Sequence, residues 1–324
     1  MDTIQWGIIG CGNVTEVKSG PALQKASRSK LVAVMRRDAD KAADYAARHN
    51  VPKWYTDAAD LINDPAVNAV YIATPPAQHE MYALQVLAAG KPVYIEKPMA
   101  LNAAACQRLS DAAAASGIKM VIAHYRRALP MFVKVKELID AKAIGDIRTI
   151  QLDMLMSRDV PKIAQTKDNW RVDPTLSGGG YFHDLAPHQL DLLLHWFGRP
   201  EKMSGFGVNQ SRQYAADDTV VGQMLFQGHV PFTGTWCFTV AKDATKEWCQ
   251  ISGTEGSIGF PFFGNHVVLK QNGIENTLPF DHPAHIQQPL IEQIVPYFLG
   301  EAENPCPPEE ATSVMEMLDI FTKK

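Results

Sequence analysis

The chain has 324 residues, 46% apolar and 20% charged, a composition typical of a soluble globular protein with room for two hydrophobic cores. Its 31 lysines and arginines against 35 acidic residues give a formal charge of −4 without a basic run, which disfavours nucleic acid and membranes as partners. No apolar stretch reaches the roughly 20 residues of a spanning helix. The amino terminus does not read as a cationic leader, and the 5 cysteines include no C-x-x-C pair. We therefore expect a cytoplasmic protein with reduced thiols.

Up to about residue 123, short apolar or β-branched runs alternate with segments of helical period. This pattern is typical of βαβ units around a parallel sheet that is buried on both faces. The predicted strands cover residues 5–9, 30–35, 69–73, 92–96 and 119–123. The predicted helices cover residues 40–49, 78–89 and 102–116, and Gly117 suits a left-handed cap at the end of the last one. We therefore predict a Rossmann domain, a doubly wound α/β sheet that binds a dinucleotide, over residues 1–123.

The rest of the chain has a different rhythm. A helix is predicted over residues 132–141, a strand over 147–156, a polar segment to residue 175 and an apolar helix over 182–197. Strands then dominate, at residues 220–226, 232–240, 248–252, 257–260 and 266–271, before two helices over 286–299 and 308–322. We predict a substrate-binding and oligomerisation domain over residues 124–324, of α/β class with a mostly antiparallel open sheet. An open sheet leaves one face to be covered, so we expect a homodimer or a higher homo-oligomer.

A glycine-rich turn follows the first predicted strand. It reads Gly10-Cys11-Gly12-Asn13-Val14-Thr15 and precedes a predicted helix, which is the context of a dinucleotide fingerprint. Gly10 permits a tight turn, and Gly12 lets backbone N–H groups, including those of Asn13 and Val14, approach a pyrophosphate. Thr15 occupies the third small position and predicts slightly wider packing of helix on strand. An ordinary βα turn is the structural alternative.

The end of the second predicted strand discriminates between the two nicotinamide cofactors. An acidic residue there binds the ribose 2′-hydroxyl of NAD, whereas a cation suits the 2′-phosphate of NADP. The residues are Arg36 and Arg37, whose guanidinium groups bind phosphate well, so NADP(H) is predicted. Asp38 follows directly and keeps NAD(H) as the alternative cofactor.

Four motifs in this order resemble one known family. They are the glycine turn, Ala73-Thr74-Pro75-Pro76 with His79, Glu96-Lys97-Pro98, and the segment from Gly178-Gly179-Gly180 to His188. On these motifs the chain resembles the glucose-fructose oxidoreductase / inositol dehydrogenase / MocA-like (Gfo/Idh/MocA) oxidoreductases over nearly its whole length, near their sugar-reductase and dihydrodiol-dehydrogenase branches. The resemblance implies an enzyme with a nicotinamide cofactor, and a cis peptide bond before Pro98.

Lys97 lies at the predicted carboxyl end of a parallel strand, where open α/β sheets place their ligands. Its ammonium group could hydrogen-bond a substrate oxygen and the nicotinamide ribose, and stabilise charge as hydride moves. A surface lysine at a strand end is the structural alternative, which the adjacent Glu96 and Pro98 disfavour.

Asp184 and His188 are spaced i, i+4, so on a helix they share one face. The carboxylate can orient the imidazole, which makes His188 the first candidate for transfer of the hydroxyl proton. Asp191, three residues after His188, continues the same face of the predicted helix. A hydrogen bond on a core helix is the structural alternative, and no metal is predicted because a nearby lysine repels a cation and further converging ligands are missing.

Further contacts are predicted by the resemblance and by residue chemistry. Thr74 and Pro75, together with His79 and Glu96, are expected to border the cofactor. Trp170 and Arg171 lie in a region where the related reductases contact cofactor or substrate, and they could equally be interdomain packing. Tyr125 and Arg126 are expected to contact the substrate, with Arg127 beside them.

These expectations combine into an NADP(H)-preferring oxidoreductase acting on a sugar, polyol or cyclitol hydroxyl or carbonyl group. In it Lys97 polarises the substrate oxygen, His188 transfers the proton and Asp184 orients His188. Two alternatives differ in chemistry. One is a redox-neutral, NAD-dependent sugar hydrolase or lyase that retains its cofactor, and the other is a nucleotide-binding regulatory protein without turnover.

Overall fold

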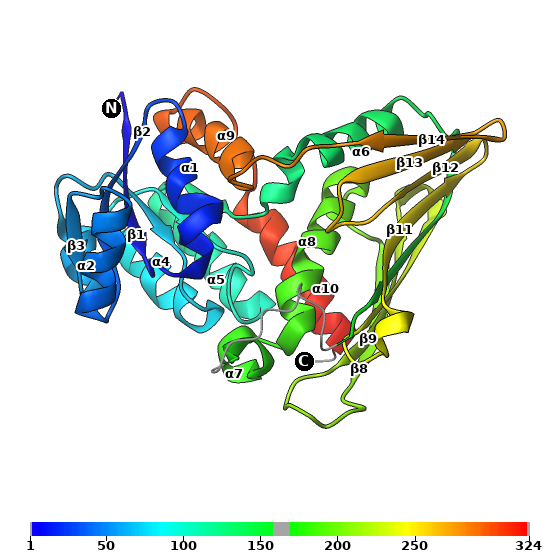
Figure 1. The fold of residues 1–324 in the computed structure, drawn as a ribbon, viewed down its shortest axis with the longest axis horizontal. Coiled ribbons are helices and arrows are strands. Elements are labelled where there is room, and N and C mark those ends of the chain that lie inside the picture. Colours follow the sequence, from blue (N-terminus) through cyan, green and yellow to red (C-terminus); the bar gives the residue numbers. More distant parts are fainter. Residues whose placement is uncertain (1, 158–168, 323–324) are drawn as a thin grey trace. The chain divides into compact units, whose positions relative to one another are not determined.

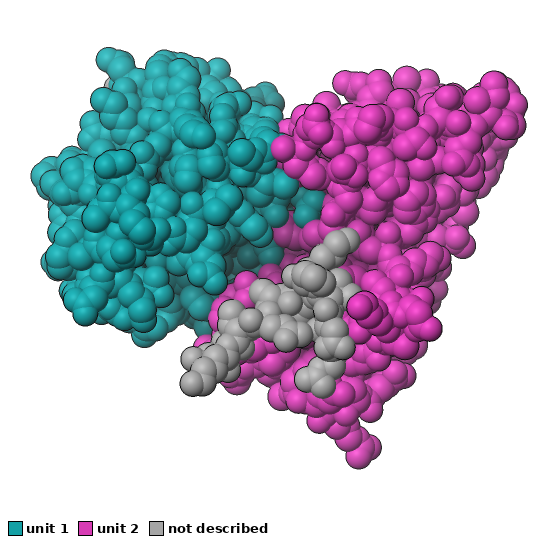
Figure 2. Space-filling model, in the orientation of Figure 1, with its two compact units in different colours: residues 1–126, 283–312 teal, residues 127–282, 313–324 magenta. Residues whose placement is uncertain are grey.

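The computed structural model describes residues 2–157 and 169–322, so residues 158–168 of the predicted polar segment lie outside the described residues. The chain divides into two compact units (Figure 2). One comprises Met1–Arg126 and Pro283–Thr312, and the other comprises Arg127–His282 and Ser313–Lys324. The domain boundary near residue 123 stays a prediction.

The first unit is built on a six-stranded sheet in the order β3-β2-β1-β4-β5-β6, with all neighbouring strands parallel. Every residue of β4 is buried, as expected of a parallel sheet with both faces covered by helices (Figure 1). This sheet confirms the predicted Rossmann-like, doubly wound fold. The strands are β1 (Ile4–Ile9), β2 (Ser29–Met35), β3 (Lys53–Tyr55), β4 (Ala69–Ile72), β5 (Val93–Ile95) and β6 (Met120–Ile122).

Helices connect these strands, and side chains cap several of them. Asp38 and Asn102 accept backbone N–H bonds at the starts of their helices, and Gly117 takes the left-handed conformation expected at a helix end. The helices of this unit are α1 (Gly20–Lys25), α2 (Ala39–Arg48), α3 (Ala58–Asn63), α4 (His79–Ala88), α5 (Ala103–Ser116) and α9 (Gln288–Leu299).

The strand order reverses at β1. Strands β2 and β3 lie on one side of it, and β4, β5 and β6 lie on the other. Such a switch point leaves a crevice at the carboxyl ends of the central strands, where open α/β sheets bind their ligands. The turns after β1, β4 and β5 therefore lie on the same side of the sheet, at the carboxyl ends of the strands. They carry the glycine turn, Thr74 and Lys97 respectively.

The second unit contains an eight-stranded sheet in the order β14-β13-β12-β11-β7-β10-β9-β8. Only β10 and β7 pair in parallel, and the other neighbours are antiparallel, which confirms the predicted mostly antiparallel sheet. The strands are β7 (Ile147–Leu155), β8 (Lys202–Val208), β9 (Thr219–Phe226), β10 (Val230–Cys237), β11 (Lys246–Gly253), β12 (Gly256–Phe260), β13 (His266–Gln271) and β14 (Ile274–Pro279).

Burial alternates along the middle strands of this sheet, so one face forms a core with the helices. The long helix α8 (Gly180–Phe197) is buried over most of its length and contacts β9 and α6 (Pro130–Asp140). Phe182 packs edge-on against Trp236 of β10, with ring centroids 5.1 Å apart. The short α7 (Pro174–Ser177) precedes α8, and α10 (Pro308–Thr322) begins in the first unit and ends in the second.

A buried ion pair anchors the start of the second unit to α8. Arg127, in the helical turn Tyr125–Ala128, donates from Nε to Asp191 Oδ2 over 2.9 Å. Both side chains are almost fully buried, so each charge depends on the other for compensation. Asp191, which continues the Asp184 and His188 stripe, is therefore held by an arginine that the sequence spacing did not pair with it.

The elements that the sequence analysis did not predict are short or exposed. Strand β3 has three residues, and the six residues of β14 are mostly exposed at a sheet edge. Strand β8, at the other edge, alternates exposed with half-buried residues and includes two glycines. Edge strands bury little, so they lack the apolar alternation that marks a strand in a sequence. The six-residue helix α3 is too short to give a clear period.

All five cysteines are free thiols. Within the described part of the chain, helices fall short of the length and apolar character needed to cross a membrane. The same residues hold no cluster of three or more His, Cys, Asp and Glu side chains suited to a metal ion.

Candidate functional site: the glycine turn and the strand ends of the first sheet

The glycine turn begins with a glycine that the fold requires. Gly10 has a φ of 92°, and a Cβ there would lie 2.7 Å from Cγ2 of Thr74. Its N–H donates to the Met35 carbonyl at the end of β2 over 2.9 Å. Gly10 thus joins the ends of β1, β2 and β4 at the switch point.

Gly12 differs because the protein leaves space around it. The nearest atom to a Cβ at this position would be the Gly10 carbonyl oxygen, 3.9 Å away. Packing therefore does not demand a glycine here, whereas close approach of a phosphate to the backbone would. The exposed Asn13 and the half-buried Val14 follow in the chain. The turn fits a dinucleotide pyrophosphate.

Thr15, in the third small position, is completely buried. Its hydroxyl donates to the Gly12 carbonyl over 2.8 Å, and its own carbonyl accepts from the Tyr45 hydroxyl over 2.9 Å. The chain continues as a π-helical turn over Thr15–Ser19 before α1 begins. A Cβ on Gly20 would lie 2.3 Å from the Thr15 carbonyl oxygen, so this glycine makes room for the turn.

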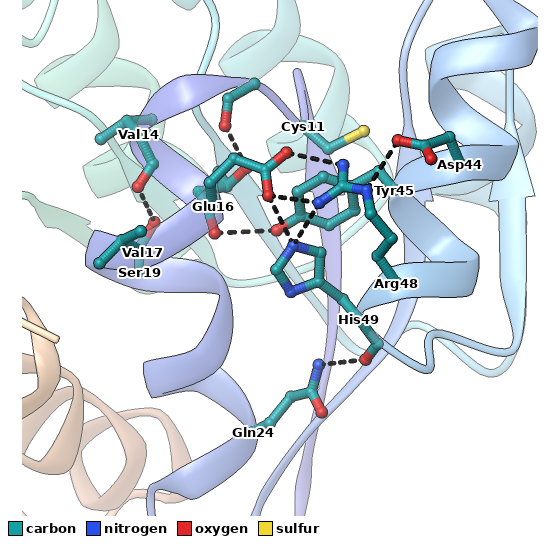
Figure 3. Close-up of polar contacts among 12 residues, drawn as sticks. Cys11, Val14, Glu16, Val17, Ser19, Gln24, Asp44, Tyr45, Arg48 and His49 are labelled. Atoms are coloured by element: carbon teal, nitrogen blue, oxygen red, sulfur yellow. Dashed lines mark hydrogen bonds and ion pairs between the residues drawn. The ribbon is translucent and has the colours of Figure 1, made fainter. Parts of the chain in front are cut away.

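An ionic cluster ties this π-helical turn to the end of α2 (Figure 3). The Glu16 carboxylate accepts from Arg48 over 2.8 and 2.9 Å and contacts His49 Nε2 at 2.8 Å. The His49 ring stacks on Tyr45 with centroids 4.2 Å apart, and Arg48 also binds Asp44. The bond from Arg48, followed by that from His49, lowers the pKa of Glu16 to about 2 against the opposing effect of burial.

The end of β2 presents a cation toward the glycine turn. Arg36 is half-buried, and its Nη1 donates to the Cys11 carbonyl over 3.2 Å. Arg37 is exposed beside it. The Asp38 carboxylate caps α2 by accepting from the Lys41 N–H and pairs with the Lys41 ammonium group at 2.8 Å, which lowers its pKa.

The turn after β4 carries Thr74 and Pro75. The Thr74 hydroxyl oxygen is buried and has no hydrogen-bond partner among residues 2–157 and 169–322, although its methyl group faces Gly10. A buried hydroxyl of this kind can bond a ligand at the strand ends. His79 is fully buried, with one ring nitrogen 2.7 Å from the Thr74 carbonyl and the other 3.0 Å from the Pro98 carbonyl. It therefore bridges the turns after β4 and β5.

The turn after β5 carries Glu96 and Lys97, and the peptide bond from Lys97 to Pro98 is cis, as the resemblance implied. Glu96 is buried, and its carboxylate accepts from the Tyr71 hydroxyl over 2.6 Å, the Gln287 amide over 2.5 Å and the Lys97 N–H over 3.1 Å. Three donors compensate this buried charge. Lys97 itself is half-buried at the carboxyl end of the sheet.

The second unit holds the other predicted catalytic residues on α8. Asp184 accepts from Arg171 Nε over 3.0 Å, and the Arg171 guanidinium group lies 4.7 Å from the centre of the Trp170 ring. His188 is buried, and its ring lies edge-on to Phe263 at 5.9 Å. Two predicted groups, Asp184 and the Trp170-Arg171 pair, are thus brought together.

The triple glycine before α8 satisfies local packing. Gly178 and Gly180 have φ angles of 89° and 77°. A Cβ on Gly179 would overlap the His183 ring, and one on Gly180 would lie 2.5 Å from the Cβ of Ala216. These glycines let α8 start against the loop between β8 and β9.

Tyr125 and Arg126, both predicted to contact substrate, are buried in the helical turn Tyr125–Ala128. The Arg126 guanidinium group lies 5.7 Å from the centre of the Tyr125 ring. The sequence analysis did not identify four residues that hold the turns of the site. Tyr71 and Gln287 bond Glu96 in the turn after β5 that carries Lys97, here called the lysine turn. Glu16 and Tyr45 hold the π-helical turn that follows the glycines. The hydrogen-bond partners described above for these four residues lie between 25 and 191 residues away in the chain, so short motifs gave no signal.

A parallel sheet with an open glycine turn at its switch point is the architecture of dinucleotide-binding enzymes. Comparison with known proteins agrees. The family model described as "Oxidoreductase family, NAD-binding Rossmann fold" matches residues 4–124, and the "GFO/IDH/MocA C-terminal domain" model matches residues 132–259. The chain belongs to the Gfo/Idh/MocA family. It is therefore an enzyme, an oxidoreductase that acts on hydroxyl or carbonyl groups with a nicotinamide cofactor.

Individual relatives span most of the chain. It is 47% identical to "Oxidoreductase P35" of Formosa agariphila over 98% of both chains. It is 30% identical to trans-1,2-dihydrobenzene-1,2-diol dehydrogenase of Sus scrofa over 78% of this chain and 72% of that one. Its fold matches the crystal structure of aldose-aldose oxidoreductase from Caulobacter crescentus complexed with glycerol, with a TM-score of 0.86 and 19% identity over 98% and 96% of the two chains.

Replacing Glu16 with glutamine should make the protein less stable at neutral pH, because Arg48 and His49 then lose their anionic partner. Because the pKa of Glu16 is lowered in the folded protein, its ionised form stabilises the fold at pH values above the ordinary pKa of 4.5. This stabilisation is lost as the pH falls toward about 2. The difference in Tm between wild type and Glu16→Gln should therefore narrow across that window in thermal unfolding. The exposed Glu303→Gln is the control. A difference that stays constant with pH would contradict the assignment.

Proposed function

We propose that this oxidoreductase prefers NADP(H) and transfers hydride between the nicotinamide and a hydroxyl or carbonyl group of a sugar, polyol or cyclitol. The substrate class is supported by the relative named for trans-1,2-dihydrobenzene-1,2-diol, a vicinal diol on a six-membered carbon ring. Pyranose sugars and cyclitols present neighbouring hydroxyl groups on six-membered rings as well. The cofactor preference is supported by the contacts at the end of β2.

The observation that carries the cofactor preference is that Asp38 is paired with Lys41, whereas Arg36 contacts the glycine turn. The acid is already engaged at the start of α2, where its carboxylate accepts from Lys41. Arg36 uses one N–H on the Cys11 carbonyl, which aims its guanidinium group over the glycine turn and leaves other donors for a phosphate. Arg37 adds a second positive charge at the surface. A 2′-phosphate suits this arrangement better than a bare 2′-hydroxyl.

The remaining contacts with the cofactor follow from the strand ends. The cofactor, when bound, supplies or accepts the hydride at its nicotinamide ring. We propose that backbone N–H groups of the glycine turn hold its pyrophosphate and that Thr74 and Pro75 border it, while His79 and Glu96 act by holding the turns that carry Thr74 and Lys97. The complete proposed set is Gly10, Gly12, Asn13, Val14, Arg36, Arg37, Thr74, Pro75, His79, Glu96, Lys97, Trp170 and Arg171.

For catalysis we propose three roles. As hydride adds to a carbonyl carbon, the C=O electron pair moves onto oxygen, and the Lys97 ammonium group stabilises the developing charge. His188 supplies the proton that converts this oxygen into a hydroxyl group, and the reverse reaction removes it. Asp184, held in turn by Arg171, orients His188 one helical turn away. Tyr125 and Arg126 are the proposed substrate contacts.

Replacing Arg36 with alanine should weaken NADPH binding by about tenfold to a hundredfold, the cost of losing hydrogen bonds between charged groups. NADH binding should change much less, because it has no 2′-phosphate. Fluorescence titration of cofactor-stripped protein with each nucleotide measures both affinities. Arg28→Ala, next to the opposite end of β2, is the matched control. Equal losses for NADPH and NADH would contradict the proposed phosphate contact.

Replacing Lys97 with alanine should lower kcat by about 10²- to 10³-fold, as expected when a group that stabilises developing charge on oxygen is removed. NADPH affinity should be largely retained, since the glycine turn and Arg36 are unchanged. Steady-state kinetics with aldoses, ketoses and dicarbonyl sugars, paired with cofactor titration, separates the two effects. Lys134→Ala, on an exposed lysine of α6, is the control. Undiminished turnover would refute the role of Lys97.

We also propose that the protein is a cytoplasmic homodimer or higher homo-oligomer. The second sheet leaves alternate residues exposed, and apolar side chains such as Phe206 and Ile274 are about half exposed or more, at 50% and 62%. A second copy of the chain would cover such a surface. Sedimentation velocity at micromolar concentration should give the mass of at least two chains. A purely monomeric profile would remove this proposal.

A further inference from the structure

A buried glutamine links the lysine turn to the helix that follows the glycine turn. Gln287 is completely buried in the first unit and belongs to the segment Pro283–Thr312, which is distant in sequence from the strands that it contacts. Its side-chain Nε2 donates to Glu96 Oε1 over 2.5 Å, and its Oε1 accepts from the Tyr94 hydroxyl over 2.9 Å. The amide therefore lies between a carboxylate and a phenol.

The chemistry of these partners fixes the orientation of the Gln287 amide. An ionised carboxylate only accepts hydrogen bonds, so the NH₂ group must face Glu96 and the carbonyl oxygen must face Tyr94. Burial raises the pKa values of Tyr71 and Tyr94 well above their usual range, which keeps both phenols protonated as donors. Glu96 then holds the Lys97 N–H with its other oxygen, over 3.1 Å.

The backbone of the same segment holds the π-helical turn. The Gln287 N–H donates to the Lys18 carbonyl over 3.2 Å. Two residues earlier, His285 Nδ1 lies 2.7 Å from the Val17 carbonyl oxygen, and its Nε2 lies 2.8 Å from the Lys25 ammonium group. Because an ammonium group only donates, Nε2 accepts and Nδ1 carries the proton that binds Val17.

From these contacts we infer that Gln287 is a positioning residue for catalysis. Its side chain sets the turn that presents Lys97, through Glu96, while its backbone holds the turn that follows the cofactor-binding glycines. The inference rests on the proposed function of Lys97. It assigns to the segment before α9 a part in the active site that the sequence motifs do not contain.

The two arms of this link separate experimentally. A substitution at Gln287 removes the bond to Glu96 but keeps the backbone bond to Lys18. Cofactor binding should therefore be retained, while the Lys97 side chain is no longer held in its position. Misplacement of a reacting group by about 1 Å can lower a rate by about a hundredfold. We therefore expect Gln287→Leu to lower kcat by about tenfold to a hundredfold and to change NADPH affinity little.

The matched control lies next to Gln287 in the sequence. Gln288 is the same residue type, is partly exposed, and binds Glu292 on its own helix over 2.8 Å. Gln288→Leu removes a glutamine hydrogen bond without touching either turn. It should leave kcat and NADPH affinity at their wild-type values.

A second variant keeps the test valid if Gln287→Leu fails to fold. In Gln287→Glu, a protonated carboxyl group can donate to Glu96 and accept from Tyr94 as the amide does. A neighbouring carboxylate and burial favour that protonated form. The kcat of this variant, relative to wild type, should be near one at acidic pH and fall as pH rises and the new acid ionises. A role limited to overall stability would give no such pH-dependent ratio.

The decisive readout does not require turnover. Hydrogen exchange of the peptide that contains Lys97, followed by mass spectrometry, reports the bond from its N–H to Glu96. We expect exchange to be about tenfold faster in Gln287→Leu, or in Gln287→Glu at high pH, and unchanged in Gln288→Leu, with the glycine-turn peptide unaffected in all three. Unchanged exchange at Lys97, or equal acceleration in both peptides, would overturn the inference. Lack of turnover by the wild type, by contrast, would count against the proposed function alone.

Discussion

The reversal of strand order at β1 is the constraint on which the first unit depends. Because β1 pairs with both β2 and β4 in parallel, the turns after these strands leave the sheet at one edge and meet there. The contact of Gly10 with Thr74 is the physical result, since any side chain at Gly10 would collide with the neighbouring turn. The position of β5 beside β4 brings Lys97 to that edge too, with His79 bridging the last two turns.

Buried polar groups then fix the positions of the turns at these strand ends. Tyr94 donates to Gln287, and Gln287 and Tyr71 both donate to Glu96, so the buried carboxylate is compensated. The Tyr45 bond to Thr15 and the Glu16 cluster do the same for the turn after the glycines. Apolar packing alone would tolerate small shifts of these turns, whereas fixed hydrogen-bond directions do not. The arrangement therefore suits a site that must align a cofactor with a lysine.

The sequence predicted the elements whose signals are local. The central strands and α8 are apolar runs, α2 separates apolar from polar residues with a helical period, and Gly117 ends α5 as its position implied. The glycine turn and Lys97 were recognisable because their chemistry is compressed into a few residues. Gln287 and Arg127 were not, because their roles depend on partners brought close only by the fold. Likewise Asp184, predicted from its spacing to His188, is held by Arg171, which no helical period connects to it.

The family places the chain among oxidoreductases, and the remaining question is whether net hydride transfer to a carbohydrate-like carbonyl takes place. The most direct measurement supplies NADPH deuterated at the transferable C4 position with a set of aldose, ketose and dicarbonyl sugars, and examines the products by mass spectrometry. We predict a product that carries one deuterium on the new carbinol carbon, formed in equal amount to the NADPH consumed. Conversion of a sugar without deuterium incorporation or NADPH consumption would contradict this and indicate the redox-neutral chemistry instead.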